Sequence, residues 1–106
     1  MMNNVMIVVT RGFATEIPNE LRTPIIELAL NHITPEMDFI FFDPEMNKHK
    51  PRYEDEGRSL RIPMKSIPKK VYAKLDDYGS KDALSEQVGY PVQTQYVLTL
   101  MLAEEY

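Results

Sequence analysis

Short apolar segments recur along this chain, and turn-forming residues separate them. The run Val5–Thr10 is apolar and β-branched without polar alternation, a pattern that predicts a strand buried in the middle of a sheet. Arg11-Gly12 follows and is expected to break it. Met37–Asp43 contains the sequence Phe-Ile-Phe-Phe and is bounded by Pro35 and Pro44, so we expect a second strand there.

A helix is predicted between these two strands. Apolar residues recur at a spacing near 3.6 from Leu21 to Ile33 and form a face broad enough to cover a sheet. Pro18 suits a first helical turn, because an N–H at that position would have no helical partner. Pro24 would remove a hydrogen bond from a continuous helix. We therefore expect one turn from Pro18, a kink or break at Pro24, and the main helix to about His32.

The middle of the chain contains one polar segment, one alternating segment and one ambiguous segment. Pro44–Gly57 is polar and is predicted to be an exposed loop. Arg58–Met64 alternates between apolar and polar residues, which predicts a half-exposed strand, and Pro63 favours an edge position because proline donates no ladder hydrogen bond. Residues 69–76 fit either a strand or a helix, and their alternation favours the strand.

The last quarter predicts a short helix and a final strand. Lys81–Val88 is expected to be helical and to end at Gly89, while the role of the segment 80–92 stays open. Gln93–Leu102 is rich in β-formers, although a helix is the alternative there. The fold predicted is α+β, with a single mostly antiparallel sheet of about four or five strands and one main helix packed on one face.

One domain is expected over residues 1–106, with Ile25, Leu28 and Phe41 together in its core. The chain has no cysteine, which excludes disulfides and cysteine-based zinc sites. It opens without the basic segment of a signal peptide, and its longest apolar runs fall far short of the roughly 20 residues that span a bilayer. We therefore expect a cytoplasmic protein that does not bind membranes.

The charges are distributed unevenly. The net charge is −4, which argues against general nucleic-acid binding, yet nine of the 12 basic residues lie between Lys48 and Lys74 with only three acidic residues among them. Three arrangements are open for these charges: they pack near the acidic ends of the chain, they spread over the surface, or they form an anion- or partner-facing surface. The anion- or partner-facing surface would contain Arg58, Arg61, Lys70, Tyr72 and Lys74, with the tyrosine available for stacking.

Residues for catalysis are scarce. His32 lies near the end of the predicted helix, where it suits the helix dipole, and His49 lies in a charged loop. Asp43 and Glu45 lie near His49, but they match no known metal-ligand spacing. The four glycines are scattered, so no phosphate-binding loop is present. We expect no catalytic residue, cofactor or metal.

A non-enzymatic interaction protein is therefore the leading hypothesis. Its partner would be an unknown protein, or a second copy bound through an edge strand, since small proteins often associate through exposed strands. The alternative hypothesis is weak binding of nucleic acid or another anionic ligand by the basic middle segment.

Two stretches resemble a known family. Val9-Thr10-Arg11-Gly12-Phe13, with the Ile-Pro-Asn-Glu-Leu that follows at 17–21, and the ending Thr99–Tyr106 resemble a small uncharacterised family of Firmicutes called domain of unknown function 960. Arg22 stands where that family usually has glutamine, Pro24 is unexpected in its helix, and residues 80–92 are longer than its hairpin. The resemblance implies a small cytoplasmic bacterial or phage-borne protein of mixed α and β structure. It brings no activity or site residues with it.

Overall fold

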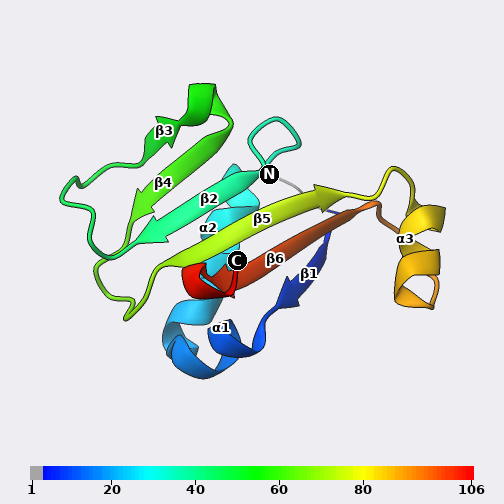
Figure 1. Ribbon diagram of the computed structural model, residues 1–106, viewed down its shortest axis with the longest axis horizontal. Coiled ribbons are helices and arrows are strands. Elements are labelled where there is room, and N and C mark those ends of the chain that lie inside the picture. Colours follow the sequence, from blue (N-terminus) through cyan, green and yellow to red (C-terminus); the bar gives the residue numbers. More distant parts are fainter. Residues whose placement is uncertain (1–3) are drawn as a thin grey trace.

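The computed structural model describes residues 4–106, and its framework is one open sheet of six strands (Figure 1). In chain order the strands are β1 (Met6–Val9), β2 (Phe39–Asp43), β3 (Arg52–Glu54), β4 (Ser59–Pro63), β5 (Val71–Asp77) and β6 (Tyr96–Leu102). Their order in space is β1-β6-β5-β2-β4-β3. The pairs β1·β6 and β2·β4 are parallel and the other three are antiparallel. The α+β class is confirmed, but the prediction of a mostly antiparallel sheet of four or five strands is wrong.

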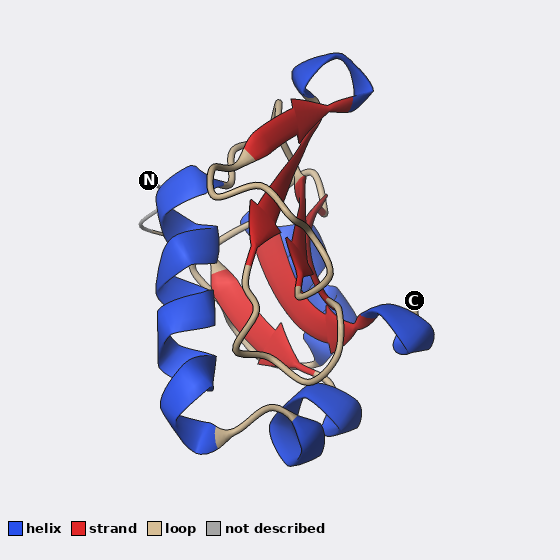
Figure 2. Ribbon diagram, turned by 90° about the vertical axis from the view of Figure 1, so that its left-hand side faces the viewer, coloured by secondary structure: helices blue, strands red, loops and turns tan. Residues whose placement is uncertain are grey.

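Helices lie on one face and at two ends of this sheet. They are α1 (Arg11–Glu16), α2 (Asn19–His32) and α3 (Lys81–Val88), and two short 3-10 turns, η1 (Asp55–Gly57) and η2 (Ala103–Glu105), complete the described elements. Figure 2 shows α2 running along one face, as predicted for the main helix. We call the opposite face the open face, because none of these three helices runs along it (Figure 2). The start of the chain, from which we argued against a signal peptide, lies largely outside the described residues.

Of the kink or break expected at Pro24, the break does not occur, because the main helix is continuous through Pro24; its predicted end at His32 is confirmed. Proline removes the hydrogen bond to the carbonyl of Glu20. Both Pro24 and Glu20 are exposed, so water can satisfy that carbonyl. The neighbouring Ile25 and Ala29 are fully buried, and their packing stabilises the helix on both sides of the missing bond.

Strand β1 is an outer strand and not the central one that its apolar sequence predicts. Among residues 4–106 it pairs only with β6, and Ile7, Val8 and Val9 are exposed by 42%, 41% and 42%. Helix α1, which sequence reasoning missed, follows immediately; the Phe13 amide donates to the hydroxyl of Thr10, which caps it. An unbroken apolar run therefore marks an exposed edge here.

The middle of the chain holds more structure than expected. The predicted loop Pro44–Gly57 contains β3 and η1, and β3 pairs with β4, so β4 is not the edge strand that Pro63 suggested. The first residue of β3, Arg52, lies opposite Arg61, so no residue of β3 lies opposite Pro63. The amide of Met64 donates to the carbonyl of Asp43 in β2. Because the backbone groups of successive strand residues point to opposite sides, the nitrogen of Pro63 faces the β3 side, at a position that β3 does not reach. Proline therefore costs the sheet no hydrogen bond.

Strands β5 and β6 and helix α3 agree with the sequence-based predictions. Residues 71–77 form a strand, as their alternation favoured, and β6 is a strand and not a helix. Helix α3 lies at one end of the sheet and ends at Gly89, whose φ of 85° lies in the left-handed region. This conformation favours glycine, which has no Cβ to clash.

The core lies between α2 and the sheet. Fully buried side chains of α2 face those of β2, β5 and β6, among them Ile40, Phe42, Val71, Ala73, Leu98 and Leu100. Ile25 belongs to this core, and Leu28 is partly buried against it. The prediction that Phe41 shares it is wrong, because Ile40 and Phe42 point into the core and strand alternation turns Phe41 to the open face.

Candidate functional site

Three of the five residues of the predicted anion- or partner-facing surface lie on the open face, on two strands that are not neighbours. Arg61 on β4 and Tyr72 and Lys74 on β5 alternate with core residues and therefore lie on the open face. Strand β2 separates β4 from β5. Arg58 and Lys70 precede these strands and are exposed.

Each of the four cations in this set has a carboxylate partner. The nitrogen–oxygen distances are 3.2 Å for Arg58–Asp55, 2.8 Å for Arg61–Asp43, 3.0 Å for Lys70–Glu45 and 3.2 Å for Lys74–Asp76. Most of these pairs are exposed and contribute little to stability. They nevertheless place negative charge beside each positive charge, so an anion approaching this face meets a neutralised surface.

Arg61 is the centre of the most buried of these ion pairs. Its guanidinium contacts Asp43 at 2.8 Å and Glu54 at 3.1 Å, and Glu54 also contacts Arg52 at 2.6 Å. Burial alone would raise the pKa of Asp43, but hydrogen bonds from the Glu45 amide and from Arg61 outweigh it and hold this pKa below its usual value.

The same balance acts on the neighbouring groups. Burial would raise the pKa of Glu54, and hydrogen bonds from Arg52 and Arg61 lower it by more. Burial would also lower the pKa of Arg61, but its bonds to Asp43 and Glu54 raise it overall. All three groups therefore stay charged at neutral pH and hold β2, β3 and β4 together on the open face.

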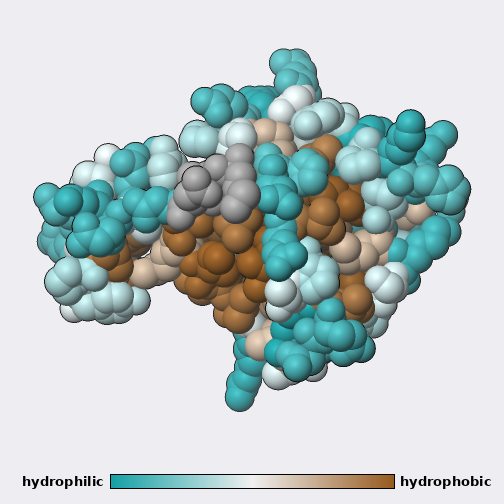
Figure 3. Space-filling view, turned by 180° about the vertical axis from the view of Figure 1, so that it is seen from behind, coloured by the Kyte–Doolittle hydropathy of each residue, from teal (hydrophilic) through white to brown (hydrophobic). Residues whose placement is uncertain are grey.

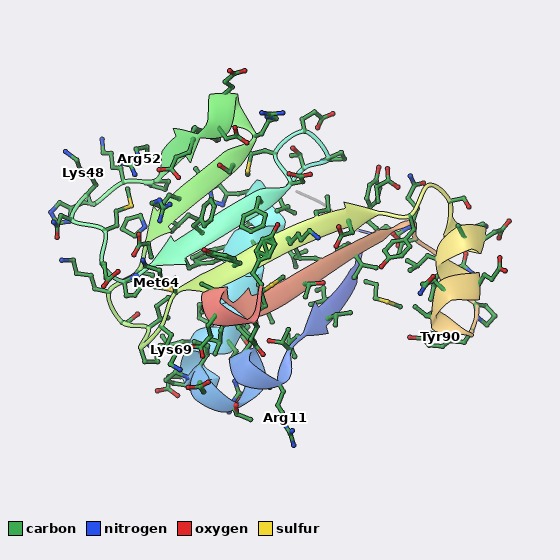
Figure 4. The ribbon with its side chains drawn as sticks, viewed as in Figure 1. Arg11, Lys48, Arg52, Met64, Lys69 and Tyr90 are labelled. Atoms are coloured by element: carbon green, nitrogen blue, oxygen red, sulfur yellow. The ribbon has the colours of Figure 1, made fainter. Side chains whose placement is uncertain are left out.

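Four aromatic rings form a cluster on the open face: Phe39, Phe41, Tyr72 and Tyr106. The ring centroids of Phe39 and Phe41 are 4.8 Å apart, and those of Phe41 and Tyr72 are 4.9 Å apart in an edge-to-face arrangement. The ring centroid of Tyr106 lies 5.5 Å from that of Phe39 and 5.7 Å from that of Tyr72. Figure 4 views the sheet from this side and shows rings standing over β2 and β5.

A hollow of about 650 Å³ opens beside this cluster. Its walls are the four rings together with Asp38, Glu54, Asp55, Arg58 and Ser59. Sequence reasoning identified Tyr72 and Arg58 in this group but missed the phenylalanines, because an aromatic strand apolar on both faces gives no sign of which face will be covered. The available signal was alternation within the Phe-Ile-Phe-Phe sequence, which places Phe39 and Phe41 on one face of the strand and Ile40 and Phe42 on the other.

The two edges of the sheet differ sharply. The β3 edge is three residues long and charged. Arg52 and Glu54 form an ion pair within the strand, and Tyr53 between them is exposed. The β1 edge carries only apolar side chains. Figure 3 views the molecule from the α2 side and shows a broad hydrophobic area left of centre, where the half-turn from Figure 1 places β1.

The backbone groups of β1 alternate between the β6 side and the outer side of the sheet. The Thr10 amide donates to Leu100 in β6 at 3.0 Å. Because the backbone groups of successive strand residues alternate between the two sides, those of Ile7 and Val9 point away from β6. No other strand within residues 4–106 lies on that side.

The residues that carry the family resemblance contact one another. The Glu105 carboxylate accepts hydrogen bonds from the Thr10 hydroxyl at 2.5 Å, the Gly12 amide at 3.0 Å and the Leu102 amide at 2.8 Å. The Thr10 bond does most to lower the pKa of Glu105, and the two amides add to it. A Cβ on Gly12 would lie 2.6 Å from the Glu105 carboxyl carbon. These motif residues therefore join the two ends of the chain.

The remaining candidates lie apart from the open face. The Nδ1 atom of His32 lies 2.9 Å from the Leu28 carbonyl within α2, and His49 is in the exposed loop before β3. Within residues 4–106, no three histidine, aspartate or glutamate side chains gather as a metal site requires. No helix in that range has the length and apolar character to cross a membrane.

Comparisons with protein-family models, curated proteins and solved structures give no match to this chain. Function is therefore inferred from the open face and from the two edges of the sheet.

Proposed function

We propose that this chain is a non-enzymatic interaction protein that self-associates through the free edge of β1. The observation that supports this most is the exposure of Ile7, Val8 and Val9, each above 40%, on a strand whose outer backbone groups are unpaired among the described residues. Natural proteins usually protect sheet edges with charge, proline or a covering segment. An apolar edge with none of these in the strand itself is suited to adding another strand.

A second copy of β1 fits this edge best. A two-fold axis through Ile7 in an antiparallel pair places Met6 opposite Val8 and Val5 opposite Val9, so apolar side chains meet across the interface. No residue from Val5 to Thr10 is charged, so two copies bring no like charges together in the strand. Pairing β1 with the β3 edge of another copy would instead bury Arg52 and Glu54, which opposes growth into fibres.

The alternative, a weak binder of nucleic acid or another anion, has less support. Arg58, Arg61, Lys70 and Lys74 are each paired with a carboxylate, and an anion would have to compete with that partner. Membership of the family called domain of unknown function 960 stays a proposal based on Thr10, Gly12 and the C-terminal residues, and it adds no activity.

Sedimentation velocity over a concentration series tests self-association. The variant Val9→Pro removes an outward N–H while leaving the bond from Thr10 to β6, so it should fold and remain monomeric. Tyr53→Lys is the matched control, because Tyr53 is an exposed aromatic residue on the other edge. We expect concentration-dependent dimers for the wild type and for Tyr53→Lys. A wild type that is monomeric at millimolar concentration, or dimers that survive in Val9→Pro, would refute the proposal.

A further inference from the structure

The open face carries a second surface, distinct from the β1 edge, in the hollow beside the aromatic cluster. We propose that this hollow binds an arginine side chain presented by an extended segment of a partner protein. The inference goes beyond self-association and does not depend on it. It rests on the arrangement of rings and carboxylates around the hollow.

The rings of the cluster already interact with cations of the chain itself. The guanidinium carbon of Arg61 lies 4.7 Å from the centroid of Phe41, and the ammonium of Lys74 lies 5.9 Å from the centroid of Tyr106. Both distances are within the range over which an aromatic face attracts a cation. The same cluster can therefore receive a further planar guanidinium on the side that faces the hollow.

The charge around the hollow favours a cation. Three carboxylates line it, those of Asp38, Glu54 and Asp55, against one guanidinium, that of Arg58. Asp55 is paired with Arg58, and Glu54 with Arg52 and Arg61. Asp38 forms no ion pair with any residue in the range 4–106. Its carboxylate is thus available to accept the forked hydrogen bonds of an incoming guanidinium.

The openness of the hollow favours a side chain over a free small molecule. Tyr106 forms part of its wall and is 67% exposed. A free ligand is usually enclosed on most of its surface, whereas a side chain needs cover only around its tip and stem. A partner segment crossing the open face can place one arginine among the rings while its backbone stays in solvent.

Titration followed by NMR tests this site. The probe is a blocked Gly-Arg-Gly peptide, and the matched control peptide contains citrulline, which keeps the shape of arginine but is neutral. Two exposed positions are varied, in Asp38→Asn and Tyr106→Ala, so that folding is retained. Asp82→Asn and Tyr90→Ala on the α3 side are the control variants, since both are exposed and lie outside the hollow.

We expect saturable shifts at Phe39, Tyr72 and Tyr106 with the arginine peptide and much weaker binding of the citrulline peptide. Asp38→Asn and Tyr106→Ala should each weaken binding by about two- to fivefold, as the loss of one exposed ion pair or cation–π contact implies. The control variants, and Val9→Pro at the distant β1 edge, should bind as the wild type does. Equal binding of both peptides, tighter binding of adenosine monophosphate, or no binding at millimolar concentration would overturn the inference.

Discussion

Phe41 and Phe42 are adjacent in β2 but belong to opposite faces, so truncating each in turn tests the two-sided structure of the sheet. Phe42 is fully buried against the α2 core, and Phe42→Ala should cost about 3–5 kcal/mol, because it removes the ring and leaves a cavity. Phe41 is only partly buried on the open face. Phe41→Ala should cost about 1–2 kcal/mol, which corresponds to its contacts with Tyr72 and Arg61 and the loss of partial burial.

Urea unfolding followed by far-ultraviolet circular dichroism measures both values, because the chain has no tryptophan to report by fluorescence. The slope of the free energy against urea should be the same for both variants, so that the difference lies in the midpoint. Equal losses would show that both faces of the sheet are covered, and a larger loss for Phe41→Ala would show that the open face is the covered one; either result would refute the assignment of a single core on the α2 side.

Two further changes test the contacts that join distant parts of the chain. Arg61→Met should cost about 1–3 kcal/mol at neutral pH, because it leaves Asp43 without a guanidinium and Glu54 with Arg52 alone. The pKa of both Asp43 and Glu54 is lowered in the folded protein, so their stabilisation exists above the unfolded pKa values of 3.8 and 4.5 and is lost as pH falls through the folded values. The cost of Arg61→Met in urea unfolding should therefore shrink at acid pH. A cost that does not change with pH would contradict this reasoning. Gly12→Ala should destabilise the wild type, because its Cβ displaces Glu105, but should stabilise a Glu105→Ala variant by about 0.5–1 kcal/mol through helix propensity. A double-mutant cycle in thermal unfolding measures this change of sign, and the same sign in both backgrounds would refute the contact.

The elements that local sequence signals define were predictable. Helix α3 ends at a glycine, β5 alternates over seven residues, and α2 repeats its apolar face, so each carries its own periodicity. The position of a strand in the sheet depends on long-range packing, which no local pattern records. The apolar sequence of β1 therefore predicted a central strand where the structure has an edge.

The candidate site was predictable only in part, for the same reason. Alternation placed Arg61, Tyr72 and Lys74 correctly on a face away from the core. The carboxylate partners of Arg61 were not foreseen, because Asp43 and Glu54 come from segments interpreted as an aromatic strand and as an exposed loop. Tyr106 reaches the cluster from the end of the chain through η2, a contact that no spacing in the sequence indicates.

Amide hydrogen exchange at the β1 edge tests the proposed self-association most directly, because it reports on the backbone groups themselves. In dilute protein the amides of Ile7 and Val9, which point away from β6, should exchange fast, while those of Val8 and Thr10 should be protected by pairing with β6. In concentrated protein, Ile7 and Val9 should become protected while Val8 and Thr10 change little. If Ile7 and Val9 exchange equally fast at both concentrations, β1 does not pair with a second copy and the proposed function is wrong.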